Sequence, residues 1–265
     1  MRGRSIDAAS FTALRLLAGA LVLALLAAWT FRRSPALRRG GSARSALALF
    51  AYAIAFSFAY LELPSGVGAL LLFGAVQLTM LVGGFLAGQR PTAFDGVGIA
   101  LALAGLAWLT LPATAAAPPS WAAAGMASAG VAWGIYSLRG RSERVPPLAA
   151  TAGNFVRSVP LALGAVLVAA LASPLHVTPR GVTLALLSGA LTSGLGYVVW
   201  YAALPGLRAA QAGLVQLAVP VLTALGGVLF LAERFTVRLG VSSVLVLGGI
   251  AVALLAGARR VGGRS

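Results

Sequence analysis

Long apolar runs follow one another along almost the whole chain and are separated by short polar segments. A helix needs about 20 apolar residues to cross a hydrocarbon core about 30 Å thick. Runs of this kind predict membrane-spanning helices over residues 8–31, 46–62, 68–90, 94–111, 121–138, 147–171, 181–204, 210–232 and 237–258. We therefore expect an all-α membrane protein, a polytopic bundle of nine transmembrane helices.

One of these runs occurs twice, 144 positions apart. Residues 68–90 read GALLLFGAVQLTMLVGGFLAGQR, and residues 212–234 read AGLVQLAVPVLTALGGVLFLAER. The identical pairs include Leu70 and Leu214, Thr79 and Thr223, Gly83 and Gly227, Arg90 and Arg234, Gly96 and Gly240, and Gly105 and Gly249. Self-similarity at a fixed spacing indicates that one structural unit has been duplicated.

The duplication predicts two repeats, residues 1–115 and 116–265, which meet in the uncharged segment PATAAAPPS. The first repeat carries four predicted helices and the second carries five. Because five spans reverse the direction of the chain, the two copies are expected to cross the membrane in opposite orientations, as in inverted-repeat transporters. The odd total implies that the first repeat lacks its opening helix.

Composition supports a membrane environment. Hydrophobic residues make up 60% of the chain and charged residues 9%, whereas soluble domains are about 25% charged. A net charge of +15 would suggest nucleic acid as the partner of a soluble protein, but here the basic residues are all arginines and lie mostly between the apolar runs. We therefore expect a lipid bilayer and no nucleic acid. Abundant Ala, Gly and Arg without Lys is typical of GC-rich bacterial genomes and favours a bacterial inner membrane.

The arginines also predict the topology. The most basic loop, residues 32–44, carries five arginines, and cytoplasmic loops carry an excess of Lys and Arg. With this loop inside, the loops after the third, fifth and seventh spans and the tail ARRVGGRS are also inside, and most of the remaining arginines lie there. The N-terminus is then expected outside and the C-terminus in the cytoplasm.

Three stretches resemble the drug/metabolite transporter superfamily, EamA type. They are FTALRLLAGALVLALL around Arg15, Pro220 followed by LFLAER with Glu233, and a last helix that contains Gly240, Gly248 and Gly249. The resemblance covers almost the whole chain. It implies ten helices in two inverted halves that move small metabolites across bacterial inner membranes.

The chain departs from that family pattern in two respects. The first of the ten helices is absent, which implies an upstream start codon, a truncation or a natural nine-helix variant. In the first repeat, Val76 and Gln89 stand where the second repeat has Pro220 and Glu233. The family signature is therefore kept in only one of the two copies.

Polar side chains inside the apolar runs are the first candidates for a binding site, because polar groups are costly in a bilayer. Gln77 and Gln216 either bond across helices or face a cavity between the two halves, and we expect the cavity. Asn154 and Arg157 share one helix face, being three residues apart. They bind an anionic substrate, or Arg157 snorkels to the interface or pairs with Glu62.

Aromatic residues form two stripes that are typical of a cavity wall. Trp133 and Tyr136 are three residues apart in one predicted helix, and Tyr197, Trp200 and Tyr201 share a face of another. Aromatic residues near helix ends usually form the interfacial belt, which we expect for Trp200 and Tyr201. The predicted substrate-binding residues are Gln77, Gln216, Trp133, Tyr136, Tyr197 and Asn154.

The chain has only five carboxylates. Asp7 and Asp95 lie near predicted helix N-termini, where a negative charge is favoured, and Glu143 lies in a basic loop. Glu233 is expected to cap a helix end or to pair with Arg234. Glu62 remains open: it is either an interfacial carboxylate in contact with water, or a site that couples proton flux to transport or pairs with a cationic substrate.

Small residues and prolines are expected to shape the bundle. Gly130 and Gly134 form a small-xxx-small pair, and Gly189, Gly194 and Gly196 lie in one predicted helix, so both helices permit close backbone approach. Pro160 and Pro220 fall inside predicted helices. A proline there removes a hydrogen bond and produces a kink, which inverted-repeat carriers use to form sites near the bilayer midplane.

Enzyme, cofactor and metal functions find no support in the sequence. There is no Lys for a nucleotide-binding glycine loop, no Cys, and a single histidine, His176, in a loop. We expect a secondary active transporter, an exporter of amino acids or related metabolites that works by alternating access and is driven by proton coupling or exchange. The alternative is a membrane scaffold or an inactive truncated carrier. A homodimer is left open.

Overall fold

The computed structural model describes residues 5–31, 40–110 and 119–262, and most of these residues are helical. Within these ranges, β structure is limited to one bridge between Ile6 and Val177. Helix occupies each of the nine predicted spans. The prediction of an all-α polytopic fold is therefore confirmed.

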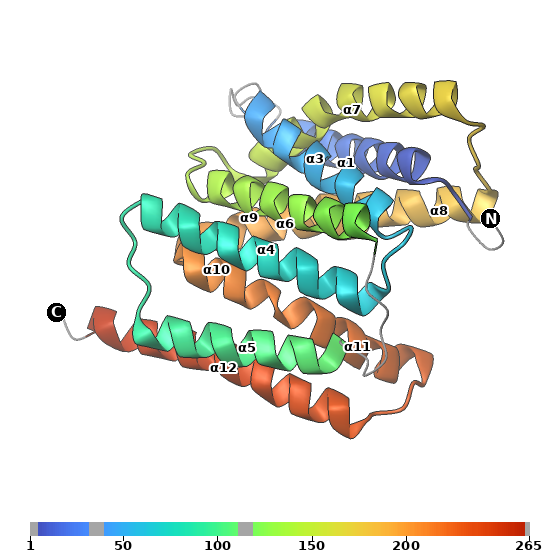
Figure 1. The fold of residues 1–265 in the computed structure, drawn as a ribbon. Helices are drawn as coiled ribbons and strands as arrows, with labels where there is room; N and C mark the ends of the chain where they lie inside the picture. Colours follow the sequence, from blue (N-terminus) through green and yellow to red (C-terminus); the bar gives the residue numbers. More distant parts are fainter. Residues whose placement is uncertain (1–4, 32–39, 111–118, 263–265) are drawn as a thin grey trace. The chain divides into compact units, whose positions relative to one another are not determined.

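The helices follow the chain in a simple order (Figure 1). The first six are α1 (Ala8–Thr30), α3 (Ala43–Ala59), α4 (Ser65–Leu86), α5 (Ala93–Thr110), α6 (Ser120–Arg141) and α7 (Pro147–Ala172). The seventh span is α8 (Pro179–Leu187), the π-helix η1 (Ser188–Leu195), α9 (Gly196–Ala203) and the 3₁₀ turn η2 (Leu204–Gly206). The eighth span is α10 (Ala209–Gln216) with α11 (Ala218–Leu231), and the ninth is α12 (Val237–Gly262).

Seven of these segments are long and apolar enough to cross a membrane, and α3, with fewer than 18 residues, is shorter. α6 does not reach the same apolarity because it is rich in Ala, Gly and Ser and ends with Arg139 and Arg141. Large apolar side chains point outward, for example Leu171 at 82% and Phe230 at 85% exposure. Outward apolar side chains on long apolar helices are what a lipid-facing surface requires, so the chain is a multi-pass membrane protein.

The chain forms two compact units. Unit 1 consists of Met1–Leu61 and Ile135–Gly206, and unit 2 consists of Glu62–Gly134 and Leu207–Ser265. Each unit takes helices from both predicted repeats, and one boundary between the units falls inside α6. The predicted repeats are therefore consecutive stretches of sequence, whereas each compact unit is a set of helices that pack together.

In unit 2, α5 and α12 lie side by side and run in opposite directions (Figure 1). A Cβ added to Gly98 would overlap the carbonyl oxygen of Gly249, and one added to Gly105 would lie 3.1 Å from the carbonyl oxygen of Ser242. Both Gly98 and Ser242, and Gly105 and Gly249, are separated by 144 positions. The contact is therefore reciprocal, as a two-fold relation between the copies requires. In this helix pair the two copies run in opposite directions, as an inverted repeat predicts.

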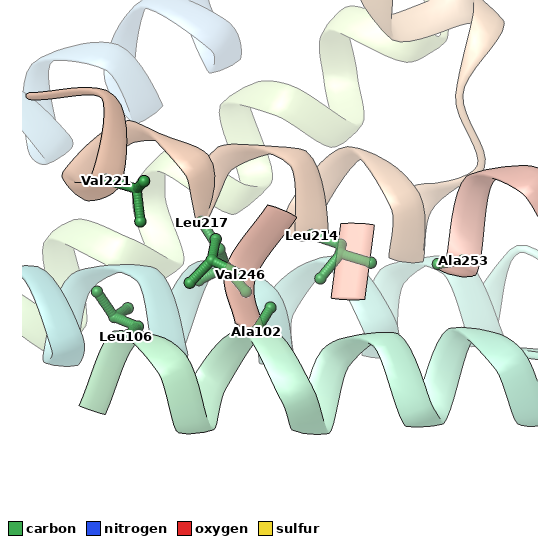
Figure 2. Close-up of a cluster of buried hydrophobic side chains, with 7 residues drawn as sticks. All are labelled: Ala102, Leu106, Leu214, Leu217, Val221, Val246 and Ala253. Carbon is green, nitrogen blue, oxygen red and sulfur yellow. The ribbon is translucent and has the colours of Figure 1, made fainter. Parts of the chain in front are cut away.

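The core of unit 2 lies where this pair meets α10 and α11. Figure 2 shows the buried apolar side chains that fill the junction. They are Ala102 and Leu106 of α5, Leu214, Leu217 and Val221 of α10–α11, and Val246 and Ala253 of α12. Since lipid tails are as apolar as these side chains, close packing rather than exclusion from water holds such helices together.

Pro220 interrupts the eighth span as predicted. α10 ends at Gln216, Leu217 is a turn residue, and α11 begins at Ala218. A proline lacks the backbone N–H and its ring clashes with the carbonyl four residues earlier, which here belongs to Gln216. The interruption therefore follows directly from the proline. Pro160, by contrast, lies inside the uninterrupted helix α7.

The small-xxx-small pair of α6 packs against α4 in unit 2. A Cβ on Gly130 would overlap the carbonyl oxygen of Leu72, and one on Gly134 would lie 2.7 Å from Cβ of Thr79. The predicted close backbone approach is therefore confirmed for this pair, and α4 is held between α6 and α10.

Asp95 and Asp7 cap helices as predicted. In unit 2, Asp95 Oδ2 accepts hydrogen bonds from the backbone N–H of Thr92 at 2.7 Å and from Arg208 Nη1 at 2.9 Å. In unit 1, Asp7 is the N-cap of α1 and accepts from the N–H of Ser10 at 2.8 Å. The ion pair between Asp95 and Arg208 adds a tie between the start of α5 and the start of α10.

In unit 1, α1 packs against α3, α7, α8 and η1. Gly19 and Gly189 allow the backbones of α1 and η1 to approach, since a Cβ on Gly19 would lie 3.0 Å from the Gly189 carbonyl oxygen and one on Gly189 would overlap that of Arg15. Gly194 stands at the same crossing, whereas Gly196 meets nothing closer than 3.8 Å. Close approach is thus confirmed for Gly189 and Gly194 and is loose at Gly196.

The glycines at the α5–α12 contact predict that adding one methyl group lowers stability at Gly249 but not at its neighbour Gly248. Gly249→Ala should lower the midpoint of thermal unfolding in detergent, because its Cβ would press on the backbone of α5, and overpacking typically costs about 1–3 kcal/mol. The matched control is Gly248→Ala, which meets nothing within 4 Å and should be neutral or slightly stabilising, as Ala favours helix over Gly. Equal midpoints for the two variants would contradict the proposed contact.

Candidate functional site

Arg15 lies in α1, inside an apolar membrane-spanning helix, and is only 7% exposed. Its Nε donates a hydrogen bond to Ser193 Oγ at 2.6 Å, and its Nη2 donates to the hydroxyl of Tyr197 at 2.8 Å. Ser193 belongs to η1 and Tyr197 to α9. Three stretches of unit 1 therefore meet at one guanidinium.

The π-helix η1 explains how these groups come together. π-helical turns are wider than α-helical turns and occur often at functional sites. Here the widened turn carries Ser193, which is 1% exposed, and leads directly into Tyr197. The absence of side chains at Gly189 and Gly194 lets this turn approach α1 at Arg15.

Aromatic rings surround the same guanidinium. Its central carbon Cζ lies 5.8 Å from the ring centroids of both Tyr52 and Phe56 in α3, within the range of cation–π attraction. The ring of Tyr197 lies 5.8 Å from that of Phe155 and 6.3 Å from that of Tyr136. The guanidinium is thus enclosed by hydroxyl groups and aromatic faces.

Tyr136 and Asn154, two predicted binding residues, join this cluster through Tyr201. The rings of Tyr136 and Tyr201 lie 4.8 Å apart, and the Tyr201 hydroxyl donates to the Tyr136 carbonyl oxygen at 3.2 Å. Asn154 Nδ2 donates to the Tyr201 hydroxyl at 3.3 Å. The expectation that Tyr201 lies in the interfacial belt is wrong: it is 2% exposed, because its ring is packed between α6 and α7.

Asn154 also fixes the start of α3. Its Oδ1 accepts from the backbone N–H of Ser42 at 2.9 Å, next to Gly41, whose φ of +69° a residue with a side chain would rarely adopt. Arg157, on the same face of α7, donates through Nη1 to the carbonyl oxygens of Gly40 and Gly153 at 2.8 and 2.9 Å. Both polar atoms of the Asn154 amide, Oδ1 and Nδ2, therefore make hydrogen bonds within the fold.

Trp133 and Gln216 form a second pair, in unit 2. The indole N–H of Trp133 donates to Gln216 Oε1, and Gln216 Nε2 donates to the Ala212 carbonyl oxygen at 3.1 Å. Both residues are buried, at 9% and 6% exposure. The structure thus brings together two predicted binding residues whose sequence positions are far apart.

Gln77 lies in the same unit, at the contact between α4 and α10. Its Nε2 donates to the Ala210 carbonyl oxygen at 3.4 Å, and among the described residues its Oε1 has no hydrogen-bond partner. The missing side chain of Gly213 makes room for this oxygen. A buried acceptor without a partner is unusual in native proteins, and it distinguishes Gln77 from Gln216.

The two acids near helix ends differ in their surroundings. Glu62 is exposed in the turn between α3 and α4, which is where an interfacial carboxylate would lie. Glu233 follows Ala232, whose φ is +54°, and its carboxylate folds back against Gly227, a glycine that leaves space for it. Glu233 therefore closes the C-terminal end of α11.

A cavity of about 500 Å³ lies elsewhere in unit 1, at the N-terminal end of α1. It is lined by Asp7, Phe58, Leu61, Ala169 and His176, among others. Asp7 Oδ2 accepts from the backbone N–H of His176 at 3.1 Å there. None of the predicted binding residues lines this cavity.

The predicted site residues therefore gather in two groups: Tyr136, Tyr197 and Asn154 in unit 1, and Gln77, Gln216 and Trp133 in unit 2. Arg15 was missing from the predicted site, although a charged residue within an apolar run is a signal of function. Of the partners of Arg15, Tyr197 is predicted from its aromatic stripe, whereas Ser193 gives no such signal, since serine is common in membrane helices.

The chain thus has the form of a multi-pass helical membrane protein with an inverted repeat and buried polar clusters, which is the form of small-molecule carriers. Residues 120–255 match the EamA-like transporter family, just over half of the chain, and the chain belongs to that family. It is accordingly a membrane transporter of small molecules.

Two further comparisons cover almost the whole chain. An uncharacterized protein of Pseudomonas aeruginosa is 52% identical over 254 residues, covering 96% of this chain and 86% of that protein. A solved crystal structure is similar with a TM-score of 0.77 and 24% identity, covering 94% of this chain and 88% of the other. The second likeness concerns the fold alone.

The two buried glutamines should differ in their effect on stability. Gln77→Met should change the free energy of unfolding by less than about 1 kcal/mol, because it removes an acceptor with no described partner together with one long hydrogen bond, from Nε2 to the Ala210 carbonyl oxygen at 3.4 Å. Gln216→Met should cost about 1–3 kcal/mol, because it removes the buried acceptor to which the Trp133 N–H donates. Thermal unfolding in detergent measures both. Adding Trp133→Phe to Gln216→Met should recover part of the loss, and an equal loss in the two single variants would contradict these roles.

Proposed function

We propose that this transporter is a secondary active carrier that exports amino acids or related small metabolites by alternating access. The reciprocal contact between α5 and α12 supports the proposal most directly, because inverted repeats exchange inward-facing and outward-facing states by swapping the conformations of two equivalent parts. Family membership supports the transport of small molecules. The interruption at Leu217 gives the eighth span a place to bend.

The substrate is proposed to contact Gln77, Gln216, Trp133, Tyr136, Tyr197 and Asn154. The unpartnered Oε1 of Gln77 supports its inclusion, since a ligand N–H or O–H would satisfy it. The bonds that Asn154 and Gln216 already make would hold their side chains in place for this contact.

The carrier is proposed to lie in a bacterial inner membrane with its C-terminus in the cytoplasm. The arginine distribution supports this orientation, and the 52% identical relative comes from Pseudomonas aeruginosa. Proton coupling or exchange would drive export. Glu62 is the proposed coupling residue because it is an exposed carboxylate at the end of a membrane helix.

Counterflow in proteoliposomes tests the carrier proposal. Vesicles loaded with unlabelled amino acids should accumulate the labelled amino acid transiently, because a carrier exchanges its substrate across the membrane without net energy input. Protein-free vesicles are the control. If neither amino acids nor other small metabolites give counterflow, with the family's first helix present or absent, the carrier proposal fails and the scaffold alternative stands.

Glu62→Gln tests the coupling proposal. If protons bind at this carboxylate, the variant should lose most of the stimulation that an imposed pH gradient gives, while counterflow, which needs no gradient, should continue. Glu143→Gln is the matched control, because Glu143 is an exposed acid in a basic loop. Transport by Glu62→Gln with unchanged pH dependence would exclude the residue from coupling.

A further inference from the structure

We infer that Arg15 is an anion-binding residue that holds the carboxylate group of the transported substrate. The inference rests on the proposed carrier function and adds to it the chemical class of the substrate and the residue that recognises it. The observation behind it is a buried guanidinium whose described partners are all neutral: the hydroxyls of Ser193 and Tyr197 and the rings of Tyr52 and Phe56.

The charge of Arg15 is permanent and costly to bury. A guanidinium is not deprotonated in proteins, and moving an ion into a low-dielectric interior carries a penalty of several kcal/mol unless an opposite charge compensates it. Within the described residues no carboxylate pairs with Arg15. An anionic ligand would supply the missing charge, and it would gain from the low dielectric of the site.

Two other arginines of the described helices show how such a charge can be compensated in this chain. Arg208 pairs with Asp95 at 2.9 Å and its side chain is 34% exposed. Arg157 donates to two backbone carbonyl oxygens at a helix end. Arg15, at 7% exposure, has neither an acid nor an exposed position. It is this difference that points to a ligand.

The neighbouring hydroxyls suit a carboxylate. Ser193 Oγ and the Tyr197 hydroxyl accept hydrogen bonds from Arg15, and a hydroxyl that accepts can also donate its own O–H. The Tyr197 O–H donates to the Tyr52 hydroxyl at 3.5 Å, a long bond that a carboxylate oxygen could replace. A guanidinium presents a planar fork of donors that matches a carboxylate, and hydroxyl donors beside it complete the coordination of an anionic group. The surrounding rings are neutral, so they would favour an apolar or aromatic substituent over a second charge.

A purely structural role is the competing explanation. In that case Arg15 ties α1 to η1 and α9 through the two hydroxyls, and no ligand reaches it. The two explanations differ in accessibility, since a guanidinium that binds a substrate must also be reachable by a reagent of similar size.

Chemical modification of the wild-type protein in proteoliposomes separates these explanations. Phenylglyoxal reacts with accessible arginines, and mass spectrometry of the peptide that contains Arg15 measures the extent. We expect Arg15 to be modified, and to be protected by at least one member of a panel of amino acids and of aliphatic and aromatic carboxylic acids. The amide of that same acid, which has the same shape without the charge, should not protect. No modification of Arg15, or equal protection by acid and amide, would overturn the inference.

Substitution gives an independent measurement. Arg15→Gln should weaken binding of the protecting acid by about 30-fold or more, as expected when one member of a buried charge pair is removed. The affinity of Arg15→Lys should lie between those of the wild type and Arg15→Gln. Arg238→Gln is the charge-matched control, because Arg238 is an exposed arginine of unit 2 and should bind the acid as the wild type does. Unchanged affinity in a folded Arg15→Gln variant would overturn the inference, and the modification experiment decides if that variant does not fold.

Failure of this inference and failure of the carrier proposal give different results. Counterflow of uncharged substrates alone, with Arg15→Gln as active as the wild type, would remove the anion site and leave the carrier. Absence of counterflow with every substrate would remove the carrier.

Discussion

A membrane interior offers no hydrogen-bond partners, so every buried polar group must find its partner within the protein. Arg15 makes the largest demand of this kind in unit 1, because its charge is fixed and its side chain is 7% exposed. The glycines at the crossing of α1 and η1, the π-helical turn that carries Ser193, and the position of Tyr197 all follow from that demand.

Unit 2 meets most of the same constraint with neutral groups and one ion pair at a helix end. Gln77 and Trp133 donate across helices to Ala210 and Gln216 of α10, while the buried Asp95 pairs with Arg208 where α5 and α10 begin. Its helices are held by backbone approach at Gly98, Gly105 and Gly249. A repeated sequence that packs against its own copy in reverse thus builds a helix pair whose close contact is made by glycines and backbone.

The sequence does not show which face of an apolar helix is buried, because the rotation of the helix depends on packing. Tyr201 was expected at the interface because it lies near the end of an apolar run, yet it turns inward to Tyr136 and Asn154. Helix occupies all nine predicted spans, and among the described residues seven segments have the length and apolarity to cross a membrane, while α3 is shorter. The runs that correspond to α3 and α6 are recognisable as helices, but small residues and arginines at their ends limit their apolar length.

The sequence by itself determined the membrane class, the helix positions, the interruption by Pro220 and the repeat, because these depend on the order of residues and on local chemistry. Only the tertiary structure decided which polar groups meet. Arg15 and Ser193 are 178 positions apart, and helices that are apolar on every side carry no periodic pattern to show which face points inward. The anion site around Arg15 therefore exists only in the packed bundle, where rotation and register of α1, α3 and η1 are fixed together.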